Sequence, residues 1–288
     1  MVAQSTYDGV SMAAFRANGL ITLTTDFGAR EPFVGIMKGV MLGHAPQLRF
    51  IDMAHEVSAF QPTEAGFWLA RALRYFPAGT LHVAVVDPGV GTARALLLAH
   101  SGEQLLLAPD NGLLAPLAAR GKLDRIIQVD SARLVKFGVS DVSATFHGRD
   151  VFAPLAAAIA AGRCNPSDVG VEVTSLHQGD WRATTPRFDG GIEGVIVAVD
   201  RFGNLISNIE SADVVALAQP TVSVGGLKLP LKRTYGDAAA GEYLGVINSF
   251  DVLEVAQSRG NAAKGLNLAV GAPISAVPGG PEAHFRRS

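Results

Sequence analysis

The run Leu81-His82-Val83-Ala84-Val85-Val86, followed at once by Asp87-Pro88-Gly89-Val90-Gly91, carries the plainest structural signal in the sequence. A short, almost wholly apolar run that ends in a Gly/Pro turn is typical of a strand buried on both faces, as in parallel sheets. Residues 21–25 and 49–52 form similar runs, and residues 62–76 have helical spacing. Strands that alternate with helices predict an α/β fold with a mainly parallel sheet.

Two segments of this half are predicted to be helices. In residues 62–76, Pro62 fits the first helical turn, and Trp68, Ala72 and Phe76 share one face. Residues 151–161 are rich in alanine and end at a glycine, which is typical of a helix and its C-terminal cap. The glycine turn after residue 86 leads into a further predicted strand at 95–99.

The second half of the chain has a different pattern. Residues 178–191 contain Pro186 and three glycines, as a linker would. Short β-rich runs follow, and they lie at 194–199, 204–209, 221–224, 243–247 and 252–255, before a predicted helix at 257–264. We predict an N-terminal α/β domain at residues 19–180 and a smaller, mostly antiparallel, barrel-like β domain at 190–279.

Composition narrows the classes of function. The 288 residues are 48% hydrophobic and 17% charged, with a formal net charge of −2. This charge, with Lys and Arg scattered along the chain, offers no basic surface to nucleic acid or to an anionic membrane. No run approaches the roughly 18 apolar residues of a membrane helix. The single cysteine, Cys164, fits a reducing compartment, so we expect a cytoplasmic protein that acts on a small molecule.

Charged residues follow two of the predicted strands. Asp26 comes directly after the first strand, where α/β sheets bind ligands. Its carboxylate is able to accept hydrogen bonds from a ribose diol. An Asp that caps a helix or forms a turn explains the same residue. The turn after the third strand brings Asp87 and Arg94 together. They form either a structural ion pair or part of a site on a glycine-rich loop.

Two of the seven histidines stand out, His147 and His55. His147 precedes the second predicted helix and is expected in a cleft rather than in the core. No His or Cys pair has the spacing of a zinc site, so no metal is expected. Gly89-x-Gly91 lacks the third glycine of a dinucleotide-binding loop and leads into a strand, which disfavours a Rossmann-type site.

The second domain offers a further cluster in Asp200-Arg201-Phe202-Gly203-Asn204. Phe202 presents a flat face for a purine, and Asn204 has the donor and acceptor that an adenine edge needs. Asp200 is able to pair with an ammonium group. A β-turn with a packed phenylalanine explains the same residues, as a hairpin explains Asn248-Ser249.

In this order, these motifs resemble the adenosine-forming S-adenosyl-L-methionine hydrolases (hydroxide adenosyltransferases), which are relatives of the bacterial fluorinase and chlorinase. The resemblance covers about residues 20–277. It rests on Thr-Asp-Phe-Gly at 25–28, Val-Gly-x-x-Lys-Gly at 34–39, Val-Asp-Pro-Gly-Val-Gly-Thr at 86–92, Pro-Asp-Asn-Gly at 109–112, Phe-His-Gly-Arg-Asp at 146–150 and Asp-x-Phe-Gly-Asn at 200–204.

The resemblance implies that the protein splits S-adenosyl-L-methionine with water into adenosine and methionine, with no cofactor. Asp87, Arg94 and His147 match the family's catalytic residues, and the halogenating relatives have Tyr in place of Asp87. Water attacks the ribose C5′ opposite the sulfur in one step. Arg94 and His147 hold the water while Asp87 takes up or relays its proton. The sequence leaves open which of these groups accepts the proton, and a neutral His147 is slightly favoured over Asp87.

The resemblance also implies a set of substrate-binding residues. Asp26 holds the ribose, and Phe60 stands in the place of an aromatic wall. Phe202 and Asn204 take the adenine, and Asp200 and Ser249 take the methionine end. The remaining pocket positions are Asn248, Glu254 and Ala256. Phe250-Asp251 departs from the family pattern of a small or basic residue followed by Gly, so the contact to the methionine carboxylate is not predicted.

The family is trimeric, which implies a homotrimer with sites between one subunit's first domain and its neighbour's second. Three other functions compete. A chlorinase-like halogenase is disfavoured by Asp87, and a Rossmann-type methyltransferase by the glycine pattern and the β-rich second half. A non-catalytic adenosine or S-adenosylmethionine binding protein leaves Asp87, Arg94 and His147 unexplained.

Overall fold

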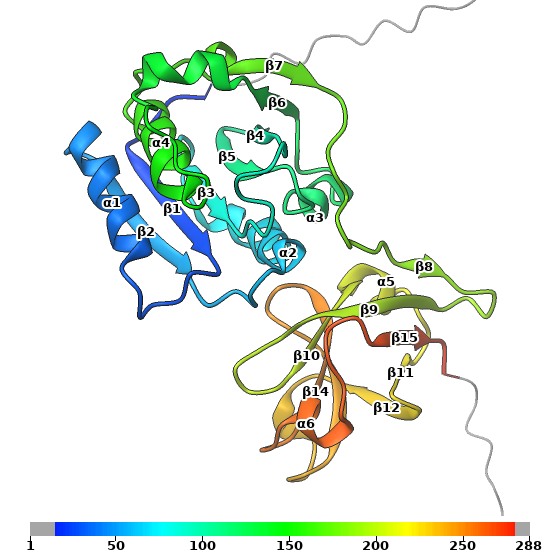
Figure 1. Ribbon diagram of the computed structural model, residues 1–288. Helices are drawn as coiled ribbons and strands as arrows, with labels where there is room; N and C mark the ends of the chain where they lie inside the picture. The colour runs from blue at the N-terminus through cyan, green and yellow to red at the C-terminus, as the bar shows by residue number, and fades with distance from the viewer. Residues whose placement is uncertain (1–14, 280–288) are drawn as a thin grey trace, which may run out of the picture. The chain divides into compact units, whose positions relative to one another are not determined.

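The computed structural model describes residues 15–279. The chain divides into two units, of which the first ends at Trp181 and the second begins at Arg182 (Figure 1). Each unit has its own sheet and its own core. Within the described part of the chain, no helix has both the length and the apolar character needed to cross a membrane.

The first unit is built on a seven-stranded sheet of order β2-β1-β3-β5-β4-β6-β7. Its strands are β1 (Leu20–Thr25), β2 (Arg49–Ala54), β3 (Leu81–Val85), β4 (Leu96–Ser101), β5 (Gln104–Pro109), β6 (Arg125–Val129) and β7 (Gly170–Val173). β2, β1, β3 and β5 are mutually parallel, whereas β4 pairs antiparallel with both β5 and β6, and β7 antiparallel with β6. The prediction of a mainly parallel sheet is confirmed.

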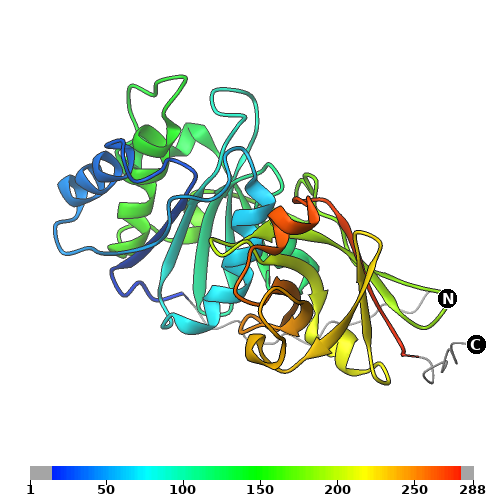
Figure 2. The ribbon, with the colours of Figure 1, turned by 90° about the horizontal axis from the view of Figure 1, so that it is seen from below.

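Helices cover both faces of this sheet (Figures 1 and 2). They are α1 (Phe33–His44), α2 (Pro62–Ala72), α3 (Ala115–Ala119) and α4 (Ala153–Ala160), with a π-helical turn at Gly148–Phe152 and 3-10 turns at Leu73–Tyr75, Ser131–Phe137 and Pro166–Asp168. α1 packs with α4 on one face, and α2 packs with α3 on the other.

The two helix layers explain why β3 is apolar apart from His82, which is fully buried. Val83 and Val85 pack in the core under α1 and α4, whereas Ala84 and Val86 pack in the core under α2 and α3. Successive side chains of a strand point to opposite faces, so a strand covered on both sides has no exposed position, and His82 is satisfied by hydrogen bonds inside the protein. The helix predicted at 62–76 is α2 continued by a 3-10 turn, and the one predicted at 151–161 is the π-helical turn continued by α4.

The second unit is a closed barrel of seven strands, β10-β14-β13-β12-β11-β15-β9, in which β9 also pairs with β10; β8 adds to β9 from outside. Its elements are β8 (Thr185–Pro186), β9 (Ile192–Val199), β10 (Leu205–Glu210), α5 (Ser211–Val215), β11 (Thr221–Val224), β12 (Leu227–Lys232), a 3-10 turn (Tyr235–Asp237), β13 (Tyr243–Ile247), β14 (Val252–Gln257), α6 (Ala262–Leu266) and β15 (Pro273–Val277). All neighbours are antiparallel except β12 and β13, as the predicted antiparallel, barrel-like domain requires.

Three details of this unit differ from the prediction. β12 and β15 were not predicted, because proline is unfavourable inside strands. β12 contains Pro230 between two lysines, and β15 begins at Pro273. The predicted helix at 257–264 is wrong at its start. Gln257 ends β14, and α6 begins only after Asn261, whose side chain accepts a hydrogen bond from the Lys264 amide at 2.8 Å as an N-cap.

Two glycines in helices test how closely α2 packs. A Cβ on Gly66 would lie 1.8 Å from the carbonyl oxygen of Leu113, whereas a Cβ on Gly39 in α1 would meet nothing within 4 Å. We expect Gly66→Ala to lower the free energy of unfolding by about 2–3 kcal/mol, the cost of overpacking. Gly39→Ala should raise it by about 0.5–1 kcal/mol through helix propensity. Urea denaturation measures both, and equal effects of the two changes would contradict this packing.

Candidate functional site

Asp87 and Arg94 face each other across the turn that follows β3. The Arg94 Nε donates to Asp87 Oδ1 at 2.8 Å and to Oδ2 at 2.7 Å, and Nη2 donates to Oδ2 at 2.5 Å. Both side chains are nearly buried, with 4% of Asp87 and 8% of Arg94 exposed. Removing either partner would leave a buried charge uncompensated, so this pair is fixed in place, unlike an exposed surface pair.

The turn between Asp87 and Arg94 depends on a glycine. Gly91 has φ +79°, and a Cβ there would lie 2.3 Å from the carbonyl oxygen of Ala144. Within the turn, the Thr92 hydroxyl donates to the Gly89 carbonyl at 2.7 Å. The turn therefore packs directly on the backbone of the segment that leads to His147, which explains how two segments more than fifty residues apart are brought together.

His147 completes the cluster from the start of the π-helical turn. Arg94 Nη2 and His147 Nδ1 lie 2.9 Å apart. A guanidinium only donates, so Nδ1 is the acceptor and a neutral His147 carries its proton on Nε2. Burial lowers the pKa of His147 and the Arg94 charge lowers it further, against the opposing effects of Asp87 and Asp150. The ring is thus kept in its neutral form.

This hydrogen bond bears on the prediction that His147 accepts a proton from water. The only lone pair of the neutral ring, on Nδ1, is already taken by Arg94. With this geometry His147 presents an N–H to its surroundings and is able to orient a water but not to deprotonate it. Of the three groups, only Asp87 retains lone pairs for a proton.

Arg94 and His147 also line a pocket of about 570 Å³ whose other walls are mainly apolar. The apolar walls come from β4, β6, the π-helical turn and the segment between β6 and His147, through Leu96, Val129, Leu134, Val135, Val139, Val142 and Val151. Apolar walls strengthen the hydrogen bonds and charge interactions at the edge of the pocket.

Asp26 and Phe60 lie together at the same edge of the sheet. Thr25 pairs with Val85, so Asp26 and Asp87 follow the carboxyl ends of adjacent parallel strands. Asp26 Oδ2 accepts a hydrogen bond from the Phe60 amide at 3.0 Å. The Phe60 ring is 71% exposed, and its backbone is in the left-handed region at φ +64°.

In the second unit, Asp200 organises the turn between β9 and β10. Its Oδ1 accepts from the amides of Phe202 at 2.9 Å and Asn204 at 2.8 Å, and its Oδ2 accepts from Asn204 Nδ2 at 2.9 Å. The turn leaves the Phe202 ring 74% exposed. Part of the donor capacity that we assigned to Asn204 for an adenine edge is therefore committed to Asp200.

Glu254 is buried on β14, on the face of the strand opposite to Leu253 and Val255, which pack in the barrel core. The Tyr235 hydroxyl donates to its Oε1 at 2.8 Å, and Asn248 Nδ2 donates to its Oε2 at 3.0 Å. Burial raises the pKa of Glu254 and the Asp200 charge raises it further, against these two hydrogen bonds. Nothing in the sequence had singled out Tyr235, because its hydrogen bond to Glu254 joins residues 19 positions apart in the chain.

The remaining predicted residues of this unit are placed near Glu254 along the chain. Asn248 and Ser249 form the turn between β13 and β14, where Asn248 Oδ1 accepts from the Phe250 amide at 2.9 Å. Ala256 is buried on β14 and pairs with Leu244. Among residues 15–279, no Lys or Arg forms a salt bridge with Asp200 or Glu254. Two carboxylates without a basic partner match a cationic ligand.

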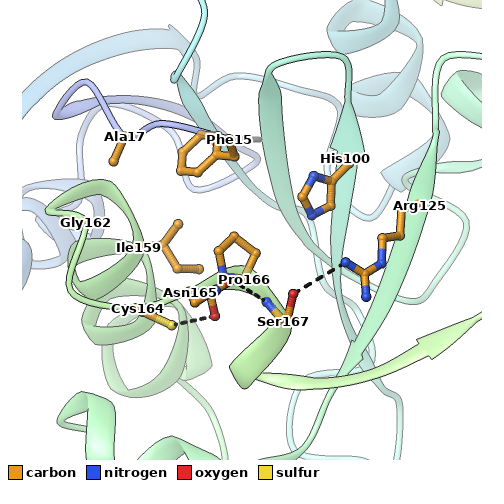
Figure 3. A pocket seen from close by; sticks show the side chains of 10 residues that line it. All are labelled: Phe15, Ala17, His100, Arg125, Ile159, Gly162, Cys164, Asn165, Pro166 and Ser167. Atoms are coloured by element: carbon orange, nitrogen blue, oxygen red, sulfur yellow. Dashed lines mark hydrogen bonds between the residues drawn. The ribbon is translucent and has the colours of Figure 1, made fainter. Parts of the chain in front are cut away.

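A second pocket of the first unit, of about 490 Å³, contains none of the predicted site residues (Figure 3). It lies between His100 on β4, Arg125 on β6 and the end of α4 at Ile159. Arg125 is already held there by Glu172 at 2.7 Å. In the part of the chain that the structure describes, no three His, Cys, Asp or Glu side chains gather as a metal site would require.

Comparison with known proteins gives a consistent family. Residues 21–170 match the model of the SAM hydroxide adenosyltransferase N-terminal domain, and residues 194–275 match that of the C-terminal domain. The chain is 37% identical to an (R)-S-adenosyl-L-methionine hydrolase of Thermus thermophilus over 255 residues, 87% of this chain and 96% of the relative. A namesake from Salinispora tropica is 37% identical over 265 residues, 90% of this chain and 98% of the relative.

More distant relatives and solved structures agree. A fluorinase of an Actinoplanes species is 26% identical over 293 residues, 90% of this chain and 97% of the relative. The crystal structure of an uncharacterized conserved protein from Thermotoga maritima has a TM-score of 0.80 and 31% identity, and the match covers 89% of this chain and 99% of that one.

The hydrogen bond between Arg94 and His147 predicts a specific state of the imidazole. We expect His147 to be neutral at pH 7 with its proton on Nε2, and to protonate only below its ordinary pKa of 6.5. Arg94→Met should raise its pKa, because a nearby positive charge is lost while Asp87 is left unpaired. Nitrogen-15 NMR of the histidine rings across pH measures both. His82, whose pKa burial lowers to about 4, is the internal control; a proton on Nδ1 would contradict the geometry.

Proposed function

The chain belongs to the S-adenosylmethionine hydroxide adenosyltransferase family, and we propose that it hydrolyses S-adenosyl-L-methionine to adenosine and L-methionine at a site that contains Asp87, Arg94 and His147. The observation that carries this assignment is the bridge by Arg94, which donates to both Asp87 and His147. The substrate is the (R) epimer at sulfur, as the names of its relatives in Thermus thermophilus and Salinispora tropica state for those proteins.

The charge pattern of the second unit supports a sulfonium substrate. S-adenosylmethionine carries a positive sulfur and an ammonium group, and Asp200 and Glu254 are carboxylates with no basic partner among the described residues. The exposed ring of Phe202 offers a stacking surface for adenine, and stacked or cationic groups over an aromatic face are stabilised.

The reaction is a single displacement at C5′. A water oxygen forms the new bond to C5′, the C5′–S bond breaks, and its electron pair stays on sulfur, which leaves as the neutral thioether of methionine. Because the sulfonium is a good leaving group, no acid is required. The protein's contribution is to hold water in line with the C–S bond, and such positioning supplies on the order of 7–11 kcal/mol.

The three residues divide this task. His147 donates from Nε2 to one lone pair of the water oxygen, and Arg94 fixes the orientation of the His147 ring, so the second lone pair of the water is free to point at C5′. As the O–C5′ bond forms, the oxygen becomes a protonated alcohol, which is a far stronger acid than a carboxylic acid. Asp87 is then basic enough to take the proton even while it is paired with Arg94.

The nearest rival, a halogenase, fits this site less well. The halide of such an enzyme would approach where a buried carboxylate, Asp87, already lies. Two buried negative charges at one point are unfavourable unless the guanidinium neutralises both. A non-catalytic binding protein would need the Asp87–Arg94–His147 arrangement for stability alone, although buried ion pairs contribute little to stability.

The remaining proposals concern assembly and location. The protein is a homotrimer whose substrate is the small molecule alone, with no cofactor, nucleic acid or membrane partner. It acts in the cytoplasm, which agrees with its single, unpaired and buried Cys164.

Asp87→Asn tests the catalytic assignment, since Asn keeps the shape but neither accepts a proton nor carries the charge. We expect kcat for S-adenosylmethionine to fall at least about 10²-fold, the usual contribution of a proton-transfer residue. The measurement is adenosine release by chromatography, with circular dichroism to verify folding.

Asp124→Asn is the matched control, because the exposed Asp124 accepts from the Gly102 amide at 2.6 Å, at the end of β4 opposite to the end that Arg94 precedes. It should leave kcat unchanged. A folded Asp87→Asn protein with wild-type turnover would overturn the assignment. A 5′-chloro nucleoside formed in chloride buffer would favour the halogenase, and tight substrate binding without turnover would favour the non-catalytic protein.

A further inference from the structure

A chain of polar contacts leads away from Asp26 and has no part in the proposed reaction. The Thr25 hydroxyl and His55 Nδ1 lie 2.9 Å apart, and His55 Nε2 lies 2.9 Å from Asp52 Oδ1. Asp52 Oδ2 accepts from Lys38 Nζ at 2.6 Å. This series of contacts thus joins the end of β1 to the end of β2 and to α1, immediately beside the loops that carry Asp26 and Phe60.

The backbones of the same two loops are also joined at His55. The Gly28 amide donates to the His55 carbonyl at 2.7 Å, and the Phe60 amide donates to Asp26 Oδ2 at 3.0 Å. The loop after β1 and the loop after β2 are therefore connected at three points, and two of these involve His55. Among the described residues, nothing donates to the other oxygen of Asp26, Oδ1, which is left for a ligand.

Phe60 requires such support. A bulky residue with φ +64° is strained, and strain of this kind persists only where neighbouring contacts hold it. Its ring is exposed and so gains little from packing. The contacts that hold it are those of its own loop, through the Asp26 carboxylate on one side and His55 on the other.

We propose that His55, held between Thr25 and Asp52, is a positioning residue that fixes Asp26 for the ribose of the substrate and Phe60 as the aromatic wall beside it. The proposal rests on the proposed function, because it takes the nucleoside end of the substrate to lie against Asp26 and Phe60. His55 itself touches no reacting atom. Its effect is on substrate affinity, so its loss raises KM and leaves the rate of the bound complex intact.

The same strand offers a matched comparison. Thr22 on β1 contacts His82 Nδ1 at 2.8 Å, which is the same pair of groups as Thr25 with His55. Thr22 and Thr25 are both buried, at 0% and 1% exposure. The Thr22–His82 pair and the Thr25–His55 pair differ in their position in the fold. His82 lies within β3 and, in the described part of the chain, forms no hydrogen bond to the loops that carry Asp26 and Phe60. A structural role predicts the same result at both sites, and a positioning role does not.

Thr25→Val and Thr22→Val each remove one hydroxyl and keep the β-branched shape. We expect Thr25→Val to raise KM for S-adenosylmethionine and the Kd of adenosine about five- to tenfold, with kcat within twofold, the size of effect that a lost hydrogen bond has. The change also removes the 3.3 Å hydrogen bond that the Thr25 hydroxyl accepts from the Phe27 amide, so the His55 variants described below isolate the contribution of His55. Thr22→Val should leave KM, Kd and kcat within twofold. Thr25→Ser, which restores the hydroxyl, should return KM to the wild-type value.

Changes at His55 separate its two contacts. Asn places a polar atom near the position of Nδ1 and Gln near that of Nε2, so His55→Asn keeps the contact to Thr25 and His55→Gln keeps the contact to Asp52. We expect His55→Asn to bind adenosine more tightly than His55→Gln. These variants also test the proposal if Thr25→Val does not fold.

Equal KM and Kd values for Thr25→Val and Thr22→Val would overturn the proposal, as would a loss of kcat without a change in affinity. Failure of the proposed function is distinguishable, because the wild-type protein would then release no adenosine from S-adenosylmethionine at all. Adenosine binding, measured by calorimetry, still compares the variants in that case.

Discussion

The guanidinium of Arg94 is the group on which the proposed chemistry depends. It neutralises the buried carboxylate of Asp87 and, through Nη2, decides which nitrogen of His147 carries the proton. A lysine would supply charge without this fork of donors, and so could not serve two partners in fixed directions. Both the neutral state of His147 and the assignment of Asp87 as proton acceptor follow from this one side chain.

The fold provides this arrangement through close backbone packing. Arg94 lies seven residues after Asp87 on a turn whose Gly91 rests on the carbonyl of Ala144, and His147 follows three residues later. A side chain at Gly91 would separate the turn from the segment that carries His147. At the neighbouring strand ends, His55 connects the loops of Asp26 and Phe60 in a comparable way, so each part of the site is held by a contact between two loops.

The sequence was sufficient for the architecture and insufficient for hydrogen-bond directions. The run of β3, apolar apart from His82, predicted a sheet covered on both faces, because such a strand has no exposed side. β12 escaped prediction although its leucines alternate with Lys228, Pro230 and Lys232, because a proline inside a run argues against a strand. The residue types Asp87, Arg94 and His147 were predictable from their motifs. The bond from Arg94 to Nδ1, the Tyr235 partner of Glu254 and the Thr25–His55–Asp52 chain were not, since each joins elements distant in sequence.

The central claim is that water, oriented by Arg94 and His147, attacks C5′ in place of any other nucleophile. Its most direct test is to incubate the protein with S-adenosylmethionine in oxygen-18 water containing chloride, and to analyse the nucleoside by mass spectrometry. The account predicts adenosine with one heavy oxygen at O5′ and no chlorinated product. Adenosine without the heavy oxygen, or a 5′-chloro nucleoside as the main product, would contradict it.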